Sequence, residues 1–386
     1  MNSLAARVAR IEPFHVMEVV KQADALERAG RSVIHLSIGE PDFTATEPVQ
    51  RAAAAAIAQA NTRYTAALGL HPLRERIAEW YSKHHGVDVE PAAIAVTAGA
   101  SAALLLTCAA LVERDTEVLL PDPSYPCNRH FIAAFDARAR LLPTGAKQRF
   151  QLDAAQVEQH WSDATRGILI ASPSNPTGTS IEPDELRRLI AAVEARGGFV
   201  ISDEIYLGLS YDGVATTALG TSDRVVAINS FSKYFAMTGW RLGWVVMPQS
   251  IRSAFERLAQ NLYICPSTVA QHAALACFEP ESMAVYEERR AEFRRRRDFL
   301  VPALERLGFK VPVHPDGAFY IYADVSGLSA DSDRFVVDVL QATGVCLVPG
   351  KDFGTHAPEQ YVRISYATSL EQLEEAVERL RTYLGR

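Results

Sequence analysis

Short, continuous apolar runs alternate with helical patterns through the middle of the chain. The runs predict buried strands at Ile94–Thr97, Glu117–Leu120, Gly167–Ala171, Phe199–Ser202, Val225–Asn229 and Leu242–Met247. Most of these strands are separated by predicted helices at Ser101–Val112, Pro126–Phe135 and Pro183–Ala195. Apolar strands that alternate with helices predict a largely parallel sheet covered on both faces. Ligands of such sheets bind at the carboxyl ends of the strands.

The last third of the chain has a different pattern. A long charged stretch from about Glu281 to Leu307 predicts one helix. It is followed by strand-like runs at Ala318–Ala323, Val345–Val348 and Tyr361–Tyr366, and by helical patterns near Ser332–Ala342 and Leu370–Leu384. This order predicts a second, smaller α/β unit, to which the stretch Ile11–Ala29 contributes its first piece. We therefore expect an N-terminal segment of the small domain (residues 1–44), a large cofactor-binding domain (45–280) and a small C-terminal domain (281–386).

Length and charge narrow the class of protein. The 386 residues exceed one ordinary core and fit two domains. The formal net charge of −7 argues against a general nucleic-acid or membrane-surface role, since both favour a basic patch. One basic run, Arg294–Arg297, is flanked by acidic residues, and we interpret it as a solvated helix face.

The cysteines and the N-terminus indicate the location of the protein. The 5 cysteines are scattered and have no C-x-x-C spacing, so we predict neither a zinc site nor a disulfide framework. The first residues form no apolar signal core, and no apolar run is long enough to cross a bilayer. The expected location is the cytoplasm.

Polar side chains gather in clusters that follow the predicted strands. The first cluster, Ser172–Gly178, contains Asn175, and the second is Asp203–Tyr206. The third, Ser230–Lys233, is followed by Arg241. Because the carboxyl ends of parallel strands meet at one edge of a sheet, we expect these side chains to lie together.

This set of side chains meets the chemical needs of pyridoxal 5'-phosphate (PLP). A lysine amine forms a Schiff base with the aldehyde of the cofactor. A carboxylate keeps the pyridine nitrogen protonated, because a nearby anion favours the cationic form. Hydroxyls, an arginine and a helix N-terminus bind a phosphate. The candidates for these jobs are Lys233, Asp203, the serines of the third cluster and Arg241.

The run Ser230-Phe231-Ser232-Lys233 followed by Gly239-Trp240-Arg241-Leu242-Gly243 resembles the fold-type I aminotransferases, class I/II, of the aspartate aminotransferase superfamily. The resemblance extends from about Ile34 to Ser369. It implies an α/β fold whose large domain has a mostly parallel seven-stranded sheet flanked by helices, with a smaller α/β domain beside it. It also implies a homodimer.

The resemblance assigns a role to each residue of the clusters. Lys233 would carry the Schiff base and move the proton, Asp203 would pair with the pyridinium, and Asn175 and Tyr206 would bond the 3'-oxygen of the ring. Ser230, Ser232 and Arg241 would bind the phosphate. The catalytic set would then be Lys233, Asp203 and Tyr206.

Four further segments resemble parts of the same site. Gly99, Ala100 and Ser101 join a strand to a helix, which suits phosphate binding by backbone donors. By resemblance, Tyr125 would stack on the cofactor ring. Tyr64 would reach the phosphate in the neighbouring subunit. The substrate carboxylate would be held by Gly39, Asn175 and Arg363, the last through a bidentate guanidinium.

The implied function is transfer of an amino group from an L-amino acid to a 2-oxo acid, either 2-oxoglutarate or pyruvate. In one bacterial subgroup of aspartate aminotransferases, a lysine at the position of Ser101 reads the distal carboxylate of the substrate. Its absence here makes alanine, or a larger apolar or aromatic amino acid, at least as good a donor as aspartate. Two other functions stay open: a PLP-dependent lyase of the same fold, and a non-catalytic PLP-binding module of a regulator.

Overall fold

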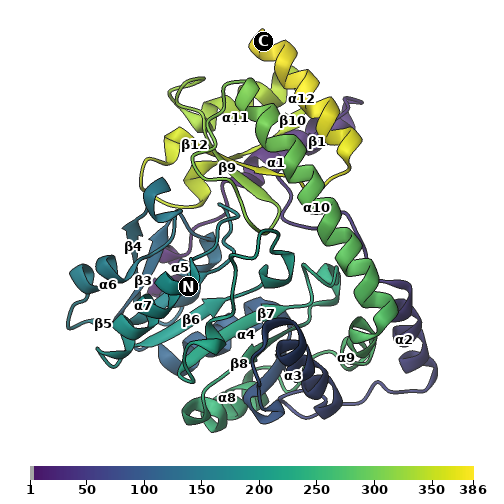
Figure 1. Ribbon diagram of the computed structural model, residues 1–386, viewed down its shortest axis with the longest axis vertical. Helices are drawn as coiled ribbons and strands as arrows, with labels where there is room; N and C mark the ends of the chain where they lie inside the picture. The colour runs from purple at the N-terminus through teal and green to yellow at the C-terminus, as the bar shows by residue number, and fades with distance from the viewer. Residues whose placement is uncertain (1–3) are drawn as a thin grey trace.

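A seven-stranded sheet and a smaller three-stranded sheet organise the chain, and one long helix runs between them (Figure 1). The computed structural model describes residues 4–386. The order of the large sheet is β2-β8-β7-β6-β5-β3-β4, and β8 alone among these strands runs antiparallel to its neighbours. The strands are β2 (Ile94–Thr97), β3 (Glu117–Asp122), β4 (Arg138–Pro143), β5 (Thr165–Ala171), β6 (Phe199–Asp203), β7 (Val225–Ser230) and β8 (Gly243–Val246). The predicted α/β fold with a mostly parallel seven-stranded sheet is confirmed.

Helices cover both faces of the large sheet. In β6, Ile201 belongs to one apolar cluster with Leu104 and Phe255, whereas Val200 belongs to the opposite cluster with Leu186. The covering helices are α4 (Gly99–Leu111), α5 (Pro126–Ala133), α6 (Ala154–His160), α7 (Pro183–Glu194) and α8 (Gln249–Leu262). Because successive side chains of a strand point to opposite faces, strands covered on both sides are apolar at every position. That is why the sequence pattern revealed them.

The smaller sheet is antiparallel and has the order β11-β12-β9. Its strands are β9 (Tyr320–Asp324), β11 (Val348–Pro349) and β12 (Tyr361–Ser365). The neighbouring helices are α11 (Ser332–Thr343), α12 (Leu370–Leu384) and the long α10 (Pro280–Arg306). The N-terminal segment joins this part of the molecule through α1 (Val16–Arg28) and through β1 (Ile34–His35), which pairs in parallel with β10 (Val345–Cys346). The domain boundaries after residues 44 and 280 stay a prediction.

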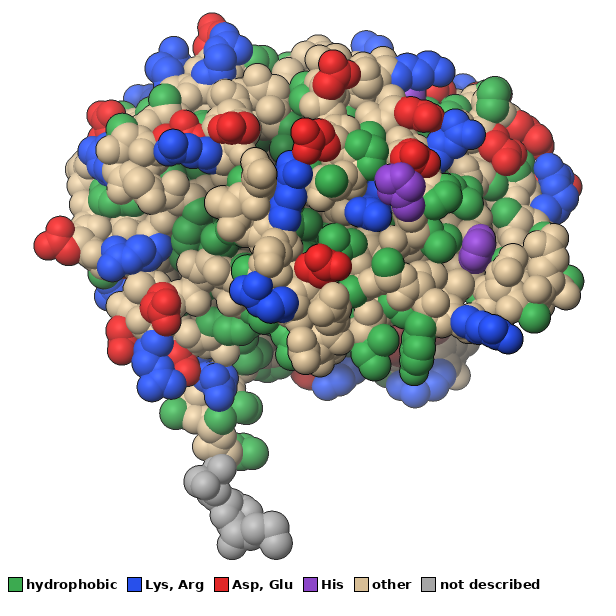
Figure 2. All heavy atoms as spheres, turned by 90° about the horizontal axis from the view of Figure 1, so that it is seen from below, with side chains coloured by type: hydrophobic (Ala, Val, Ile, Leu, Met, Phe, Trp, Pro, Cys, Tyr) green, Lys and Arg blue, Asp and Glu red, His purple; other side chains and the backbone are tan. Residues whose placement is uncertain are grey.

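The remaining helices lie beside the large sheet, toward the N-terminal end of α10 (Figure 1). They are α2 (Glu47–Ala58), α3 (His71–His85) and α9 (Thr268–Leu275). Acidic and basic side chains are interspersed over the face shown in Figure 2, in line with the modest net charge. Within residues 4–386, no helix combines the length and apolar character that crossing a membrane requires.

Three local expectations were wrong. The strand β4 was not predicted, because it lies at the edge of the sheet and its arginines interrupt the apolar run. The single strand expected at Val345–Val348 is two short strands, β10 and β11, which pair in different sheets. The run Arg294–Arg297 is not a uniformly solvated face, because Arg296 is 3% exposed and Arg297 is 8% exposed.

Long-range ion pairs explain the two buried arginines. Both terminal nitrogens of Arg296 donate to the carboxylate of Asp42, at 2.8 and 2.9 Å. Arg297 pairs with Asp212 and donates to Pro315 O at 2.9 Å. A buried charge needs such partners, because burial without them is costly. The acceptors lie on distant loops that the composition of the helix does not reveal.

Candidate active site

A cavity of about 410 Å³ lies at the carboxyl ends of the large sheet. Asp203 ends β6 and Ser230 ends β7, while Asn175 lies in the turn that follows β5. The predicted site residues that line the cavity are Gly39, Ala100, Ser101, Tyr125, Asn175, Asp203, Tyr206, Ser230, Ser232, Lys233, Arg241 and Arg363. Gly99 lies directly behind this lining. Tyr64 does not line the cavity, and it is 80% exposed.

Lys233 and Asp203 are the ionisable pair at the base of the cavity. Burial lowers the pKa of the Lys233 amine to about 8, and Nζ donates to Gly39 O at 2.5 Å. Asp203 is 5% exposed, and its carboxylate accepts a hydrogen bond from Ile205 N at 3.2 Å. Burial raises the pKa of Asp203 to about 6. A buried carboxylate with so little neutralisation suits a ligand that brings a positive charge.

The start of α4 and the segment that joins β7 to β8 form a compact anion cradle. Ser230 Oγ donates to Ser232 Oγ at 2.9 Å and accepts from Ser232 N at 3.0 Å. Gly99 has a φ of +83°, and a Cβ built on it would lie 2.7 Å from Arg241 Nη2. Glycine is therefore needed for the guanidinium to approach the helix N-terminus. Hydroxyls, an arginine and free helix N–H groups together suit a phosphate.

Arg363, on β12, is buried between two aromatic rings. Its guanidinium carbon lies 4.5 Å from the centre of the Tyr320 ring and 5.0 Å from that of Phe353. It donates to Asn175 Oδ1 at 3.1 Å and to Ser37 O at 2.6 Å. Its Nε has no hydrogen-bond partner among residues 4–386. A fixed, planar cation with a free donor is suited to a carboxylate.

Tyr320 was not predicted from the sequence. Its hydroxyl bonds that of Tyr206 at 2.9 Å, and burial raises the pKa of Tyr206, which keeps this phenol protonated. A Cβ at Gly39 would lie 2.9 Å from the Tyr320 hydroxyl, so the absence of a side chain lets this hydroxyl approach the backbone closely. In the sequence, Tyr320 reads as an ordinary core residue of a strand. No local pattern marks it as part of a site.

The far side of the cavity is apolar. Its side chains come from the start of the chain, from α4 and from the segment after β6: Phe14, Val16, Met17, Val20, Ile38, Leu104 and Ile205. The cations in the lining are Lys233, Arg241 and Arg363. All three belong to the groups of residues described above. Asp352 and Phe353, which sequence reasoning missed, also line the cavity.

Comparison with known proteins identifies the family. The family model of aminotransferase class I and II matches residues 31–380. The valine–pyruvate aminotransferase of Mycobacterium tuberculosis is 40% identical over 386 residues, with 100% of this chain and 99% of the relative covered. The chain therefore belongs to the class I and II aminotransferases.

Solved structures agree in fold. An aminotransferase from Mycobacterium tuberculosis has a TM-score of 0.96 at 40% identity, with 100% of both chains covered. The aspartate aminotransferase of Thermus thermophilus with maleate has a TM-score of 0.93 at 33% identity, covering 99% of this chain and 100% of the other. The protein is an aminotransferase, which moves an amino group from an amino acid to a 2-oxo acid.

Proposed function

We propose that this aminotransferase binds PLP in the 410 Å³ cavity and acts mainly on amino acids with apolar side chains. The observation that carries the cofactor assignment is that an amine, Lys233, and a buried carboxylate, Asp203, line the same cavity as the anion cradle. When bound, PLP supplies a ring that accepts the electrons released as the substrate loses its α-proton. The residues present fit each part of this group.

The residues of the large sheet divide the work of holding the cofactor. Lys233 binds the aldehyde through Nζ and moves the proton at the substrate α-carbon. Asp203 holds a proton on the ring nitrogen, because an anion favours the cationic form. Asn175 and Tyr206 would donate to the 3'-oxygen, and Tyr125 would pack against the ring. The phosphate is bound by Gly99, Ala100, Ser101, Ser230, Ser232 and Arg241.

Arg363 orients the substrate through its α-carboxylate, with Gly39 and Asn175 beside it. The bond from Arg363 to Asn175 Oδ1 connects this site to the cofactor side. Because Arg363 is held by Ser37, Asn175 and two rings, its orientation is set before the substrate arrives. Phe14, Val16 and the neighbouring apolar side chains form an apolar surface at the distal end.

The apolar distal end and Ser101 support an apolar donor. A second substrate carboxylate would meet Phe14, Met17 or Leu104 rather than a cation. The name of the Mycobacterium tuberculosis relative, a valine–pyruvate aminotransferase, agrees with this assignment and favours pyruvate as the acceptor. The aspartate aminotransferases among the relatives, at 34% identity in Thermotoga maritima, keep aspartate as the second candidate.

Two further assignments complete the proposal. The exposure of Tyr64 outside its own cavity supports a homodimer in which this side chain reaches the partner's phosphate site. We also keep the cytoplasm as the proposed location.

A half-reaction screen tests the proposed function. The purified holoenzyme is mixed with each of the twenty amino acids in turn, and the absorbance of the bound cofactor is followed. We expect the fastest conversion with valine and other apolar amino acids, and slow conversion with aspartate and glutamate. Conversion by aspartate ahead of every apolar amino acid would contradict the donor class. A holoenzyme that none of them converts would contradict the function.

A further inference from the structure

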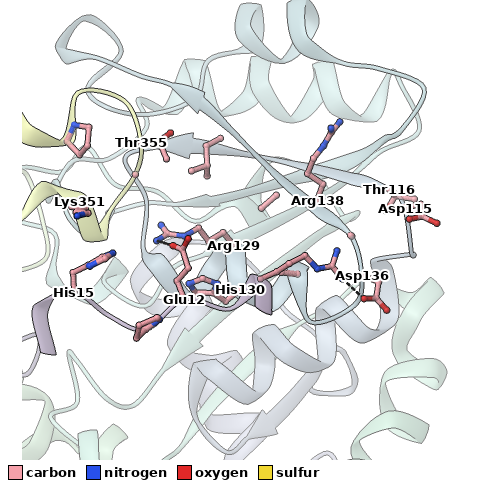
Figure 3. A pocket seen from close by; sticks show the side chains of 18 of the residues that line it. Glu12, His15, Asp115, Thr116, Arg129, His130, Asp136, Arg138, Lys351 and Thr355 are labelled. Atoms are coloured by element: carbon pink, nitrogen blue, oxygen red, sulfur yellow. Dashed lines mark hydrogen bonds and ion pairs between the residues drawn. The ribbon is translucent and has the colours of Figure 1, made fainter. Parts of the chain in front are cut away.

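The segment from residue 12 to residue 17, which leads into α1, separates two cavities. Phe14, Val16 and Met17 line the active-site cavity. Glu12, Pro13 and His15 line a second, outer cavity of about 1130 Å³. Figure 3 shows this outer cavity, with Glu12 beside Arg129 and with His15 and Lys351 near each other. The start of α1 is therefore a thin wall whose two sides face different cavities.

The segment Lys351–Thr355 forms the other half of this wall. Asp352 and Phe353 line the active-site cavity, whereas Lys351, Gly354 and Thr355 line the outer cavity. The two halves are far apart in sequence and meet in space. What holds them together therefore determines the shape of the distal end of the active site.

Asp352 fastens the two halves. It is 2% exposed, and its Oδ1 and Oδ2 accept from His15 N and Val16 N, both at 2.7 Å. The first N–H groups of a helix have no partner inside the helix, and a side chain just before it usually caps them. The N-cap residue His15 makes no such bond. Asp352, which lies 337 positions after His15 in the sequence, supplies this cap instead.

The wall is also tied to the large sheet. Arg129, on α5, donates through Nη1 to Asp352 O at 3.2 Å, and its Nη2 lies 3.8 Å from Glu12 Oε2. Apolar packing adds to this connection, because Val16 packs against the cluster that contains Phe353, whereas Phe14 is 37% exposed and Met17 is 48% exposed. The two hydrogen bonds to Asp352 join the halves directly.

We infer that Asp352 is a positioning residue that sets the specificity of the enzyme for the size of the donor side chain. This inference rests on the proposed function, because it concerns the distal end that an apolar donor would occupy. Loss of the cap releases the first turn of α1, so a long apolar side chain loses contact with Phe14 and Met17. The α-carboxylate is bound by Arg363, which packs against Phe353 of the wall, and this loop stays held through the backbone bond from Arg129 to Asp352 O. A short substrate such as alanine does not reach Phe14 or Met17.

A series of donors of increasing length measures this effect. The half-reaction of the holoenzyme is followed with alanine, 2-aminobutyrate, norvaline and norleucine, for the wild type and for Asp352→Asn and Asp352→Ala. In the wild type, each added methylene raises kcat/KM. In Asp352→Ala we expect norleucine to lose about tenfold, the size of a lost helix cap, and alanine to change less than about threefold. Asp352→Asn keeps one acceptor oxygen, so its loss of kcat/KM with norleucine should be smaller than that of Asp352→Ala.

A matched control is available in the same part of the molecule. Asp331 caps α11 by accepting from Asp333 N at 2.9 Å and Arg334 N at 3.3 Å, and it does not line the active-site cavity. Asp331→Ala should lose a comparable cap and leave the dependence on donor length unchanged. Hydrogen exchange adds a readout that does not require turnover. Amides of residues 12–20 should exchange faster in Asp352→Ala and at the wild-type rate in Asp331→Ala.

The outcomes separate this inference from the proposed function. An equal loss for all four donors, or an unchanged dependence on length, would overturn the positioning role while the enzyme remained an aminotransferase. So would unchanged exchange of residues 12–20 in Asp352→Ala. A wild-type holoenzyme that converts no member of the series would instead overturn the proposed function.

Discussion

The two sides of the cavity are built in different ways. The base and the anion cradle come from short segments at the ends of neighbouring strands, such as Asp203 on β6 and Ser230 on β7. The substrate side is assembled from Arg363 on β12, from the start of α1 and from the loop with Asp352. The first side is therefore fixed by the core of the large sheet. The second depends on a few long-range contacts, so changes there should alter selectivity more than chemistry.

The largest effect is expected at the base. Lys233→Ala removes both the attachment point and the proton carrier, so turnover should fall at least about 10⁴-fold, the upper range for general acid–base catalysis. Borohydride reduction of the wild-type holoenzyme, followed by peptide mapping, should label Lys233. Lys351→Ala, a change of an exposed lysine on the outer cavity, is the control and should keep its activity. Label on another lysine would contradict the assignment.

Asp203 should rank second. Asp203→Asn still allows PLP to bind but removes the anion that keeps the ring nitrogen protonated. If the pKa of that nitrogen falls by about two units, turnover should be roughly a hundredfold slower. Single-turnover rates with valine provide the measurement. A variant within about threefold of the wild type would contradict this role.

The same variant should stabilise the protein without cofactor. Burial raises the folded pKa of Asp203 to about 6, above its ordinary value of 3.8, so the folded state binds the proton more tightly than the unfolded state. This contribution to stability is complete below about pH 4 and is lost as the pH rises through about 6. At neutral pH, Asp203→Asn should therefore raise the Tm of the cofactor-free protein, and the gain should vanish near pH 4. A lower Tm at neutral pH would contradict the claim that the buried Asp203 carboxylate destabilises the cofactor-free protein.

The attachment of the cofactor should depend on pH. Burial lowers the pKa of Lys233 to about 8, and the neutral amine is the nucleophile. The rate of PLP uptake by the cofactor-free protein should rise about tenfold between pH 7 and pH 9, with a midpoint near 8. Stopped-flow absorbance at constant ionic strength measures it. A midpoint near 10 would show an amine with the ordinary pKa of lysine.

On the substrate side, Arg363→Lys keeps the charge and loses the planar fork. We expect kcat/KM to fall about tenfold or more for donor and acceptor alike, because a lysine cannot form both parallel hydrogen bonds to a carboxylate. Steady-state kinetics with valine as donor and with pyruvate as acceptor test whether the two substrates are affected equally. An effect on one substrate alone would place Arg363 at a side-chain pocket instead.

The same contrast explains what the sequence could predict. Asp203 and Ser230 end strands that are largely apolar, and Lys233 follows three residues later, so one pattern located both the strands and these residues. Tyr320 and Asp352 act through partners far along the chain, and their neighbours in sequence do not indicate those partners. Arg296 shows the same limit, since its burial depends on Asp42.

The smallest effect is expected at Tyr64, which belongs to neither side of its own cavity. It is 80% exposed, so a role at the phosphate requires a second copy of the chain. Tyr64→Ala should weaken PLP binding about fivefold, the value of one hydrogen bond. The sharper test mixes Tyr64→Ala chains with Lys233→Ala chains under conditions of subunit exchange. If the site is shared, one site of each heterodimer combines an intact Lys233 with the partner's intact Tyr64. Tight PLP binding should then return at about half of the sites. If Tyr64 instead acts within its own subunit, no such site forms, and verified exchange without recovery would remove the shared site.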